Sequence, residues 1–291
     1  MSIKQVPPAE FRVPAHFSYS SLDEWCLCPR RTYYHRIQGL VPLGNAPAPE
    51  FGKAWHLLME AHYKGASPAE ALEAFRAYWQ AYLDTGEVLI GRKAEMYTME
   101  RVEKMYAAYR AKYASENFEV LAHEGGTELG FELPLGDTTY KGIIDLVIRR
   151  PNYGVVVMDH KTSSRIDSFY QKTLNPSLQF TGYVWAAEQH FENVYGVCVN
   201  GTLCAKVEVK HERFWQTYSR LEIEEWKREV VRYMDEIKRE VEAGAEGLWP
   251  RHTNACNHFN STCPYHLLCT SREPFMEQAA SENLYRRAEE A

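Results

Sequence analysis

Apolar residues recur at two different spacings along this chain, which indicates helices in its first part and strands in its middle. Up to about residue 115 they return every three or four positions, the period of an amphipathic helix. Helices are expected over residues 18–37, 51–63, 68–83 and 94–114. Ser20 or Ser21 could cap the first helix, and Ser67-Pro68-Ala69-Glu70 has the pattern of a capping box with proline at the first helical position. The proline-rich stretch 41–50 predicts a loop.

After residue 116 the pattern changes to alternation and to short apolar runs rich in β-branched residues, which predicts strands. They are expected over residues 119–123, 127–133, 139–149, 154–160, 194–200 and 205–214, with breakers such as Gly125-Gly126 and Gly136-Asp137 between them. Helical spacing returns over 176–190 and, in a charged amphipathic form, over 223–242, whereas 248–269 is irregular. This order predicts an α/β (α+β) protein with a central mixed β-sheet flanked by helices.

The expected elements form three regions of one integrated domain. A helical N-terminal region covers residues 1–115, a core sheet covers 116–215, and a C-terminal helix with a cysteine-rich segment covers 216–291.

Composition narrows the class of protein. The chain has 291 residues, with 33 Lys and Arg against 39 Asp and Glu, and a formal net charge of −6. This balance excludes a histone-like protein that coats nucleic acid through its overall charge, but it leaves room for a localised basic channel. No apolar run approaches the ~18 residues of a membrane helix, and the N-terminus lacks the apolar stretch of a signal peptide. We therefore expect a cytoplasmic protein without membrane contact.

Charged residues within two expected strands are the main candidates for chemistry. A run of valines leads directly to Asp159-His160-Lys161, and alternation along a strand places Asp159 and Lys161 on one face, roughly 6–7 Å apart. Asp145 lies inside another apolar strand, where an ionised carboxylate needs a cation or strong hydrogen bonds. Two carboxylates and a lysine could hold one or two Mg²⁺ or Mn²⁺ ions, with the lysine orienting or deprotonating a water. A surface ion pair and a strand-end acid would explain the same residues.

Two helical positions add to these strands. His56 shares a helix face with Glu60 and Tyr63, where a single histidine is more often structural than a ligand. Gln179 and Tyr183 are four residues apart on the helix after the Asp-x-Lys strand, so they project from one face. They could hydrogen-bond a phosphate or a base, or simply cap the sheet.

These residues form short motifs that follow one another in a recognisable order. The motifs are Gly-x-x-x-His (52–56), Gly-x-x-Asp (142–145), Asp-x-Lys (159–161) and Gln-x-x-x-Tyr (179–183). Together they resemble the PD-(D/E)XK nuclease superfamily, and the histidine and the Gln-x-x-x-Tyr element resemble its RecB-like branch. Ile144 replaces the proline of the superfamily's name. The segments Ser18–Leu22 and Cys28-Pro29-Arg30-Arg31, with the terminal cysteines, resemble iron–sulfur members such as AddB-type and CRISPR-associated RecB-like exonucleases.

The resemblance implies a restriction-endonuclease-like core and a divalent-metal-dependent DNA exonuclease that acts on single strands or DNA ends in recombination or repair. It implies catalytic roles for Asp145, Asp159, Lys161, Gln179 and Tyr183. It implies that Mg²⁺ or Mn²⁺ is held by His56, Asp145, Asp159 and the backbone carbonyl of His160. A helicase or annealing-protein partner, an oligomer, and a bacterial or phage-infected host cell are further implications.

Seven cysteines in a chain expected to be cytoplasmic point to metal or catalysis before disulfides. Cys256, Cys263 and Cys269 crowd into one short segment and need a fourth ligand, for which the resemblance selects Cys28. Four thiolates suit a [4Fe–4S] cluster or structural Zn²⁺, and the resemblance favours the iron–sulfur cluster. The substitute ligands are Cys26, His252, His258 and His266. Cys198 and Cys204, in expected strands, are typical of small buried apolar residues.

A local basic region lies near the N-terminus, where residues 1–40 carry five Lys and Arg against three Asp and Glu. Trp25 and Tyr34 are interleaved with Arg30 and Arg31, so this region could bind DNA by stacking on bases and contacting phosphates. Aromatic residues at helical spacing are, however, more often part of a core.

Other classes of protein remain to be weighed. A non-catalytic DNA-binding module with the same fold and a structural metal cluster is the main alternative, although the complete set of two acids and a lysine argues against it. A zinc hydrolase is disfavoured because His-Glu-x-x-His is absent, and a base deaminase because Pro-Cys-x-x-Cys is absent.

Overall fold

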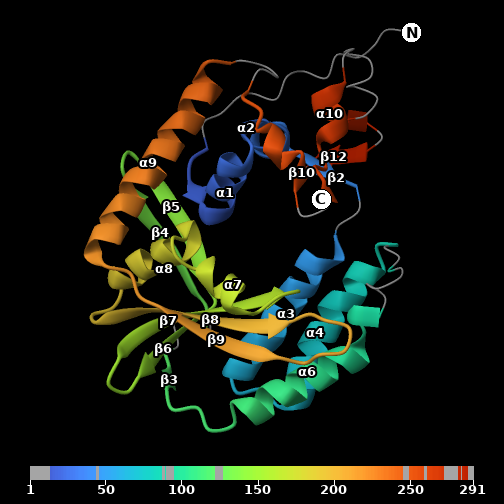
Figure 1. Ribbon diagram of the computed structural model, residues 1–291, viewed down its shortest axis with the longest axis vertical. Coiled ribbons are helices and arrows are strands. Elements are labelled where there is room, and N and C mark those ends of the chain that lie inside the picture. The colour runs from blue at the N-terminus through green and yellow to red at the C-terminus, as the bar shows by residue number, and fades with distance from the viewer. Residues whose placement is uncertain are drawn as a thin grey trace. The chain divides into compact units, whose positions relative to one another are not determined.

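The computed structural model describes residues 14–43, 46–86, 89, 95–121, 127–244, 249–258, 261–271, 281–282 and 284–287. The chain groups into two compact units, each assembled from separate stretches of sequence (Figure 1). The first unit comprises Met1–Gly44, Glu132–Lys141 and Lys227–Ala291, and the second comprises Asn45–Phe131 and Gly142–Trp226. Residues from both ends of the chain therefore belong to the same unit.

A mixed sheet is the centre of the second unit. In spatial order its strands are β3 (Glu119–Val120), β6 (Leu146–Arg150), β7 (Gly154–Ser163), β8 (Val194–Leu203) and β9 (His211–Gln216). β7 pairs antiparallel with β6 and parallel with β8, and β8 pairs antiparallel with β9. The parallel pair needs a crossover connection, which α7 (Ser168–Lys172) and α8 (Leu178–Glu188) supply.

Helices cover the two faces of this sheet (Figure 1). Alternate residues of β7 point to opposite faces. His160 faces α3 (Pro47–Tyr63), where the ring of Tyr63 stacks on it, whereas Asp159 faces α8, where Gln179 reaches it. α3 packs with α4 (Pro68–Leu83) and α6 (Met99–Lys112) around a core rich in aromatic residues, which makes a firm support for one side of β7.

The first unit joins the two ends of the chain by strand pairing. β2 (Leu40–Pro42) pairs antiparallel with β12 (Tyr285–Arg287), and the hydroxyl of Tyr265 donates to the carbonyl of Leu40 at 2.7 Å. Its other elements are β1 (Phe17–Ser18), α1 (Tyr19–Leu27), α2 (Pro29–Thr32), the π-helix Tyr33–Ile37, the 3₁₀ helix Thr253–Ala255, β10 (Asn257–His258), β11 (Ser261–Thr262) and α10 (His266–Thr270). Three elements contribute residues to both units: β4 (Leu129–Leu135), β5 (Thr138–Ile144) and α9 (Arg220–Glu242). Among the described ranges, none of the helices has both the length and the apolar character needed to cross a bilayer.

The α/β fold class expected from the sequence is confirmed, and so is the capping box, in which Ser67 and Glu70 exchange hydrogen bonds at the start of α4. The single helix expected over residues 18–37 was wrong. It is divided into α1, α2 and the π-helix, and its cap is Ser18 rather than Ser20 or Ser21. Cys28 is extended, with φ −165° and ψ 111°, because the proline that follows it disfavours a helical backbone.

Other boundaries also moved. The loop expected over 41–50 contains the end of β2 and the first turn of α3, which tolerates Pro47 because the first N–H groups of a helix have no partner within it. The strand expected over 139–149 breaks into β5 and β6 at Asp145, and the strand expected over 205–214 begins only at His211. Helix α7 was not predicted. Residue 94 and residues 122–126, where a helix, a strand and a glycine breaker were expected, lie outside the described residues.

Candidate active site

The two acids expected to act together meet beside β7 in the second unit. Asp145 lies between β5 and β6, and the backbone N–H of His160 donates to its Oδ2 at 2.8 Å. The antiparallel register of β6 and β7, which pairs Leu146 with Met158, brings Asp145 to this point. Asp159 is only 1% exposed. The structure therefore brings the Asp145 carboxylate to the backbone N–H that directly follows Asp159, close enough for the two charges to interact.

Each acid faces a cation-forming side chain. Nζ of Lys161 lies 3.1 Å from Oδ1 and 2.9 Å from Oδ2 of Asp159. Nδ1 of His56 lies 3.4 Å from Oδ2 of Asp145. Because Asp159 is buried, its contact with Lys161 is not the surface ion pair that the sequence alone would also have allowed.

Gly52, one turn before His56, allows this approach. A Cβ atom at Gly52 would lie 3.3 Å from Oγ1 of Thr162, closer than an ordinary contact. The missing side chain therefore lets α3 pack closely against β7 and bring His56 to Asp145.

The residues expected on the helix after β7 also reach the site. Nε2 of Gln179 donates to Oδ1 of Asp159 at 3.3 Å and to the hydroxyl of Tyr183 at 3.1 Å. Both side chains are buried. A Cβ atom at Gly142 would lie 2.6 Å from Cζ of Phe131 and 3.4 Å from Cε1 of Tyr183, so this glycine leaves the space that Phe131 and Tyr183 fill.

Burial and neighbouring charges separate the two carboxylates electrostatically. Burial raises the pKa of Asp159 to about 6, even though Lys161 acts in the opposite direction. Burial also acts to raise the pKa of Asp145, but the charge and hydrogen bond of His56 outweigh it and hold that pKa below its usual value. Burial acts to lower the pKa of Lys161, and Asp159 and Asp145 raise it above its ordinary value. Lys161 is therefore a cation at neutral pH and is suited to donating hydrogen bonds rather than to accepting a proton.

The donor atoms of this site fit a hard divalent cation. Oδ2 of Asp159 is buried and accepts no hydrogen bond, since Nζ of Lys161 lies near it but outside hydrogen-bonding geometry. In the described part of the chain, no group of three or more His, Cys, Asp or Glu side chains is already arranged to hold a metal. Mg²⁺ does not need such a group, because it is commonly bound by one or two carboxylates together with waters and substrate oxygens. Asp145, Asp159 and the carbonyl of His160 are compatible with that pattern.

One neighbour of the site was not singled out by the sequence. Asn200 is paired with His160 across β7 and β8, and its amide contacts Nδ1 of the His160 ring at 2.9 Å. Burial lowers the pKa of His160 to about 3, so the ring is neutral. A polar amide directly after the apolar run of β8 is the signal that could have identified Asn200.

The four cysteines selected as cluster ligands line one cavity of the first unit. Cys28, Cys256, Cys263 and Cys269 surround it with Arg31, Arg251, Tyr265 and His266, among others. Two of them flank the antiparallel strands β10 and β11, and the N–H of Cys263 donates to the carbonyl of Cys256 at 2.8 Å. Burial raises the pKa of Cys269 to about 11, and the neighbouring thiols add to this effect. All four are free thiols that line this cavity.

The substitute ligands differ in position. Cys26 lines a different cavity, together with Tyr233, so Cys28 is the better placed of the two N-terminal cysteines. His252 and His266 line the cysteine cavity, whereas the side chain of His258 lies outside the described part of the structure. Cys198 and Cys204 are buried elsewhere, as expected of small apolar residues.

The aromatic residues expected to stack on DNA bases are buried, so that expectation was wrong. Trp25 packs edge-on against Trp249 with ring centroids 5.7 Å apart, and Tyr34 stacks on Tyr265 at 5.9 Å. Nε of Arg30 donates to the carbonyl of Trp249 at 2.8 Å. These rings belong to the core of the first unit, which is the common outcome for aromatic residues at helical spacing.

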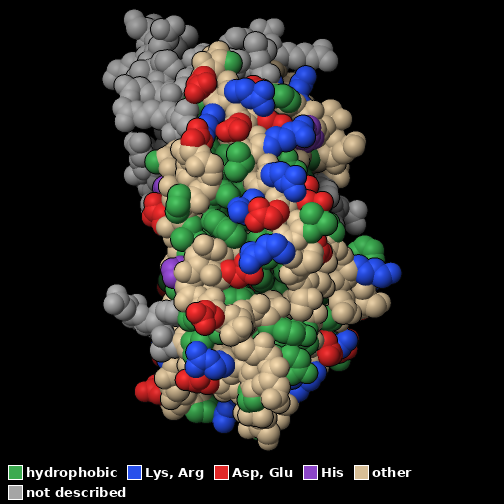
Figure 2. Space-filling model, turned by 90° about the vertical axis from the view of Figure 1, so that its left-hand side faces the viewer, with side chains coloured by type: hydrophobic (Ala, Val, Ile, Leu, Met, Phe, Trp, Pro, Cys, Tyr) green, Lys and Arg blue, Asp and Glu red, His purple; other side chains and the backbone are tan. Residues whose placement is uncertain are grey.

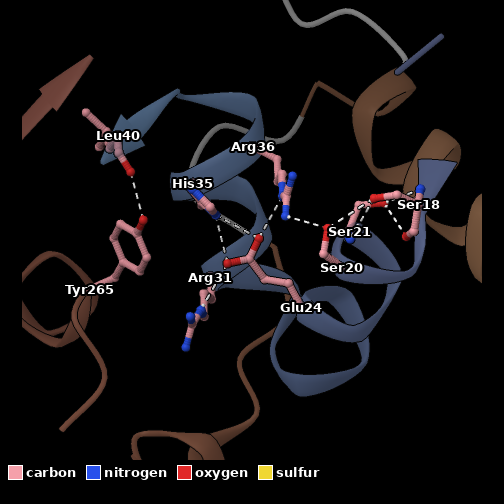
Figure 3. A network of polar contacts seen from close by, with 9 residues as sticks. All are labelled: Ser18, Ser20, Ser21, Glu24, Arg31, His35, Arg36, Leu40 and Tyr265. Carbon is pink, nitrogen blue, oxygen red and sulfur yellow. Dashed lines mark hydrogen bonds and ion pairs between the residues drawn. The ribbon is translucent and has the colours of Figure 1, made fainter. Parts of the chain in front are cut away.

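Arg31 belongs to a network around a buried carboxylate, and about one third of its side chain remains exposed. Glu24 is buried, and its carboxylate contacts Nε of Arg31 at 3.0 Å, Nδ1 of His35 at 2.9 Å and Nε of Arg36 at 3.0 Å (Figure 3). Burial acts to raise the pKa of Glu24, but His35 and Arg36 lower it overall. On the face shown in Figure 2, basic and acidic side chains are interspersed, in keeping with the modest net charge.

The protein-family model described as PD-(D/E)XK nuclease superfamily matches residues 16–270 of the chain. The chain belongs to the PD-(D/E)XK nuclease superfamily.

One solved structure has a similar fold. A crystal structure from Eubacterium rectale, whose protein is described as a candidate exonuclease, is 13% identical and has a TM-score of 0.51. The match covers 96% of this chain and 99% of that one. A second structure, described as SSO0001, is 14% identical over 88% of this chain and 89% of that one, with a TM-score of only 0.32. No curated protein matches the chain.

Proposed function

We propose that this protein is a divalent-metal-dependent deoxyribonuclease of the RecB-like branch that removes nucleotides from DNA ends. The observation that carries the proposal is the convergence of Asp145, Asp159 and Lys161 at one point of β7. A preference for single strands, a role in recombination or repair, and a helicase or annealing-protein partner rest on the resemblance alone.

Each residue then has a distinct task. His56, Asp145, Asp159 and the carbonyl of His160 would hold Mg²⁺ or Mn²⁺. The bound ion would polarise the phosphate and make its water a stronger nucleophile. Lys161 donates to the charge that develops on the phosphate, where a fixed cation is most effective. Gln179 holds the Asp159 carboxylate in place, and Tyr183 supports Gln179.

A nuclease assay with end-labelled DNA tests this function. Single- and double-stranded substrates, each labelled at the 5′ or the 3′ end, are incubated with Mg²⁺ or Mn²⁺ and with a chelator. Metal-dependent release of nucleotides from one end supports exonuclease activity. Internal fragments would instead indicate an endonuclease. Asp145→Asn should abolish cleavage. Binding of DNA without cleavage by the wild-type protein would favour the non-catalytic DNA-binding module.

We also propose that Cys28, Cys256, Cys263 and Cys269 hold a [4Fe–4S] cluster. Their shared cavity supports this assignment, because four thiolates on one centre suit iron–sulfur clusters. Such a cluster would tie the N-terminal helices to the C-terminal segment within the first unit. Protein purified without oxygen should be brown, with broad absorbance in the visible blue and stoichiometric iron and sulfide. A colourless protein with one zinc per chain would overturn the cluster in favour of structural Zn²⁺.

A further inference from the structure

A buried polar network lies behind β7, on the side that faces α3. It consists of Tyr63, Tyr109, Glu116, Asn200 and Arg213, and it ends on the ring of His160. The Arg213 side chain is 12% exposed and that of Glu116 is 18% exposed, so this ion pair is largely withdrawn from water. Buried polar groups of this kind are costly unless each finds its partner.

The donor and acceptor of each hydrogen bond in the network can be assigned starting from Arg213, because its guanidinium can only donate. Its Nε faces Oδ1 of Asn200 at 3.4 Å, so the carbonyl side of the Asn200 amide turns toward Arg213. The amide nitrogen then faces the hydroxyl of Tyr109 at 2.7 Å and Nδ1 of His160 at 2.9 Å. Both of its hydrogens have an acceptor, which leaves Nδ1 of His160 without a proton.

The remaining protons follow by elimination. Nη2 of Arg213 faces Glu116, the Tyr63 hydroxyl at 3.0 Å and the Tyr109 hydroxyl at 3.1 Å, one acceptor more than its two hydrogens can serve. The Tyr109 oxygen accepts from Asn200, and its own hydrogen goes to the Tyr63 hydroxyl at 2.6 Å because the Tyr63 hydrogen goes to Glu116. Tyr63 in turn donates to Glu116 at 3.2 Å. Glu116 also accepts from Nη2 of Arg213, which closes the circuit. Reversing the Asn200 amide would set its donating nitrogen against Nε of Arg213, and reversing the Tyr109–Tyr63 link would remove the Tyr63 hydrogen bond to Glu116.

This network contacts His160, the residue whose backbone carbonyl belongs to the proposed metal site. The Tyr63 ring stacks on the His160 ring with centroids 5.7 Å apart and an interplanar angle of 15°, while Asn200 holds its Nδ1. The same His160 donates its backbone N–H to Asp145 and offers its carbonyl to the proposed metal. Holding the ring at both its face and its edge therefore fixes the backbone of His160, whose N–H and carbonyl lie in the two peptide units between Asp159 and Lys161.

We propose that Asn200, oriented by Arg213, is a positioning residue that holds His160 in the Nε2–H tautomer and thereby fixes the metal-binding segment of β7. The catalytic part of this inference rests on the proposed nuclease function, whereas the tautomer does not.

Nitrogen NMR of the metal-free full-length protein tests the tautomer. We expect His160 to show a protonated Nε2 and a bare Nδ1. Asn200→Asp replaces the donating amide by an acceptor, so Nδ1 of His160 should gain a proton. Thr202→Val is the matched control: Thr202 lies two residues along β8 and bonds Nδ1 of another buried histidine, His211, at 3.0 Å. Its substitution should leave the His160 signals unchanged. A wild-type Nδ1–H tautomer, or identical His160 signals in Asn200→Asp, would overturn the proposal.

Kinetics test the positioning role. Asn200→Asp should lower kcat by about 10- to 100-fold at saturating metal, the usual effect of losing a partner that orients a metal ligand, with little change in KM for DNA. Arg213→Lys keeps the charge opposite Glu116 but lacks Nε, so it should lower kcat in the same direction and mix the two tautomers of His160. This second variant decides the matter should Asn200→Asp fail to fold. An unchanged kcat in folded Asn200→Asp contradicts positioning, whereas an inactive wild-type protein with the expected tautomer contradicts only the nuclease function.

Discussion

The backbone N–H of His160 donates to the carboxylate of Asp145 at 2.8 Å, across fifteen positions of sequence. This bond joins the break between β5 and β6 to the middle of β7. It also means that the orientation of Asp145 depends on the same residue, His160, whose ring is held by Asn200. The acidic site and the buried network behind it therefore share one residue, and a change on either side of β7 should be felt on the other.

Loss of the Lys161 cation should remove most of the activity without preventing folding. Lys161→Ala deletes the cation beside Asp159, and removal of one preorganised donor to a developing charge typically costs about 10²- to 10³-fold in kcat. Lys104→Ala is the control, because Lys104 forms only an exposed pair with Glu100 on α6. This variant should cleave DNA like the wild type. The rates are measured as nucleotide release at saturating DNA. Equal rates for Lys161→Ala and the wild type would remove Lys161 from the mechanism.

A side chain at Gly142 should destabilise the second unit. Its Cβ atom would lie 2.6 Å from the rigid ring of Phe131, and overpacking of this kind costs about 1–3 kcal/mol. Gly130→Ala, on the neighbouring strand β4, meets nothing within 4 Å and serves as the control. Urea unfolding should give a lower midpoint for Gly142→Ala than for Gly130→Ala. Coincident curves would show that Phe131 moves aside without cost.

The free energy of unfolding should decrease as the pH drops below about 6.5, because His211 is buried as a neutral ring. Nε2 of His211 donates to the carbonyl of Met105 at 2.9 Å, and burial lowers the pKa of His211 from 6.5 to about 4. The unfolded chain therefore takes up a proton from pH 6.5 downward, whereas the folded chain does so only near pH 4. Stability is lost across this window, by up to about 3 kcal/mol.

His211→Gln keeps a donor for Met105 but does not titrate. The free energy of unfolding of this variant should fall less steeply between pH 6.5 and 4 than that of the wild type. The comparison is made on metal-free protein by denaturant unfolding. Parallel pH profiles for the two proteins would mean that His211 is not responsible.

The carboxylate of Glu24 should matter for the stability of the first unit. Glu24→Gln removes the charge that Arg31, His35 and Arg36 share and turns one of its two acceptor oxygens into a donor. We expect a loss of about 1–3 kcal/mol, since the three partners are each about one-third exposed and partly hydrated. Glu236→Gln breaks an i,i+4 pair with the exposed Arg232 and should cost less than about 0.5 kcal/mol. Chemical denaturation of the two variants gives the difference directly. A cost for Glu24→Gln as small as that for Glu236→Gln would contradict the network's role.

Cys26 and Cys28, only two positions apart, should differ in their effect on the proposed cluster when each is replaced by serine. Cys28→Ser should lose the visible absorbance and most of the iron, because Cys28 lines the cavity of the other three thiols. Cys26→Ser should keep both, since Cys26 lines another cavity. Iron and sulfide content per chain is measured after anaerobic purification. The reverse pattern would make Cys26 the ligand.

Local patterns predicted the elements near the site better than their ends. The capping box at Ser67 and the alternation that separates Asp159 from His160 are set by neighbouring residues, so they could be read directly. The prediction of one long helix over 18–37 was wrong at Cys28, because the proline that follows it disfavours a helical backbone there. The regular spacing of apolar residues did not indicate this local break.

The sequence by itself determined the candidate acids, the lysine, the order of the motifs and the crowding of three cysteines, because these depend on residue type and spacing along the chain. Only the tertiary structure decided that Asp145 meets the N–H of His160, that Asn200 and Arg213 stand behind it, and that Trp25 and Tyr34 are covered. Such contacts follow from which strands pair, and in which register, and from which helix faces pack together. A shift of one residue in that register would turn every side chain of β7 to the other face.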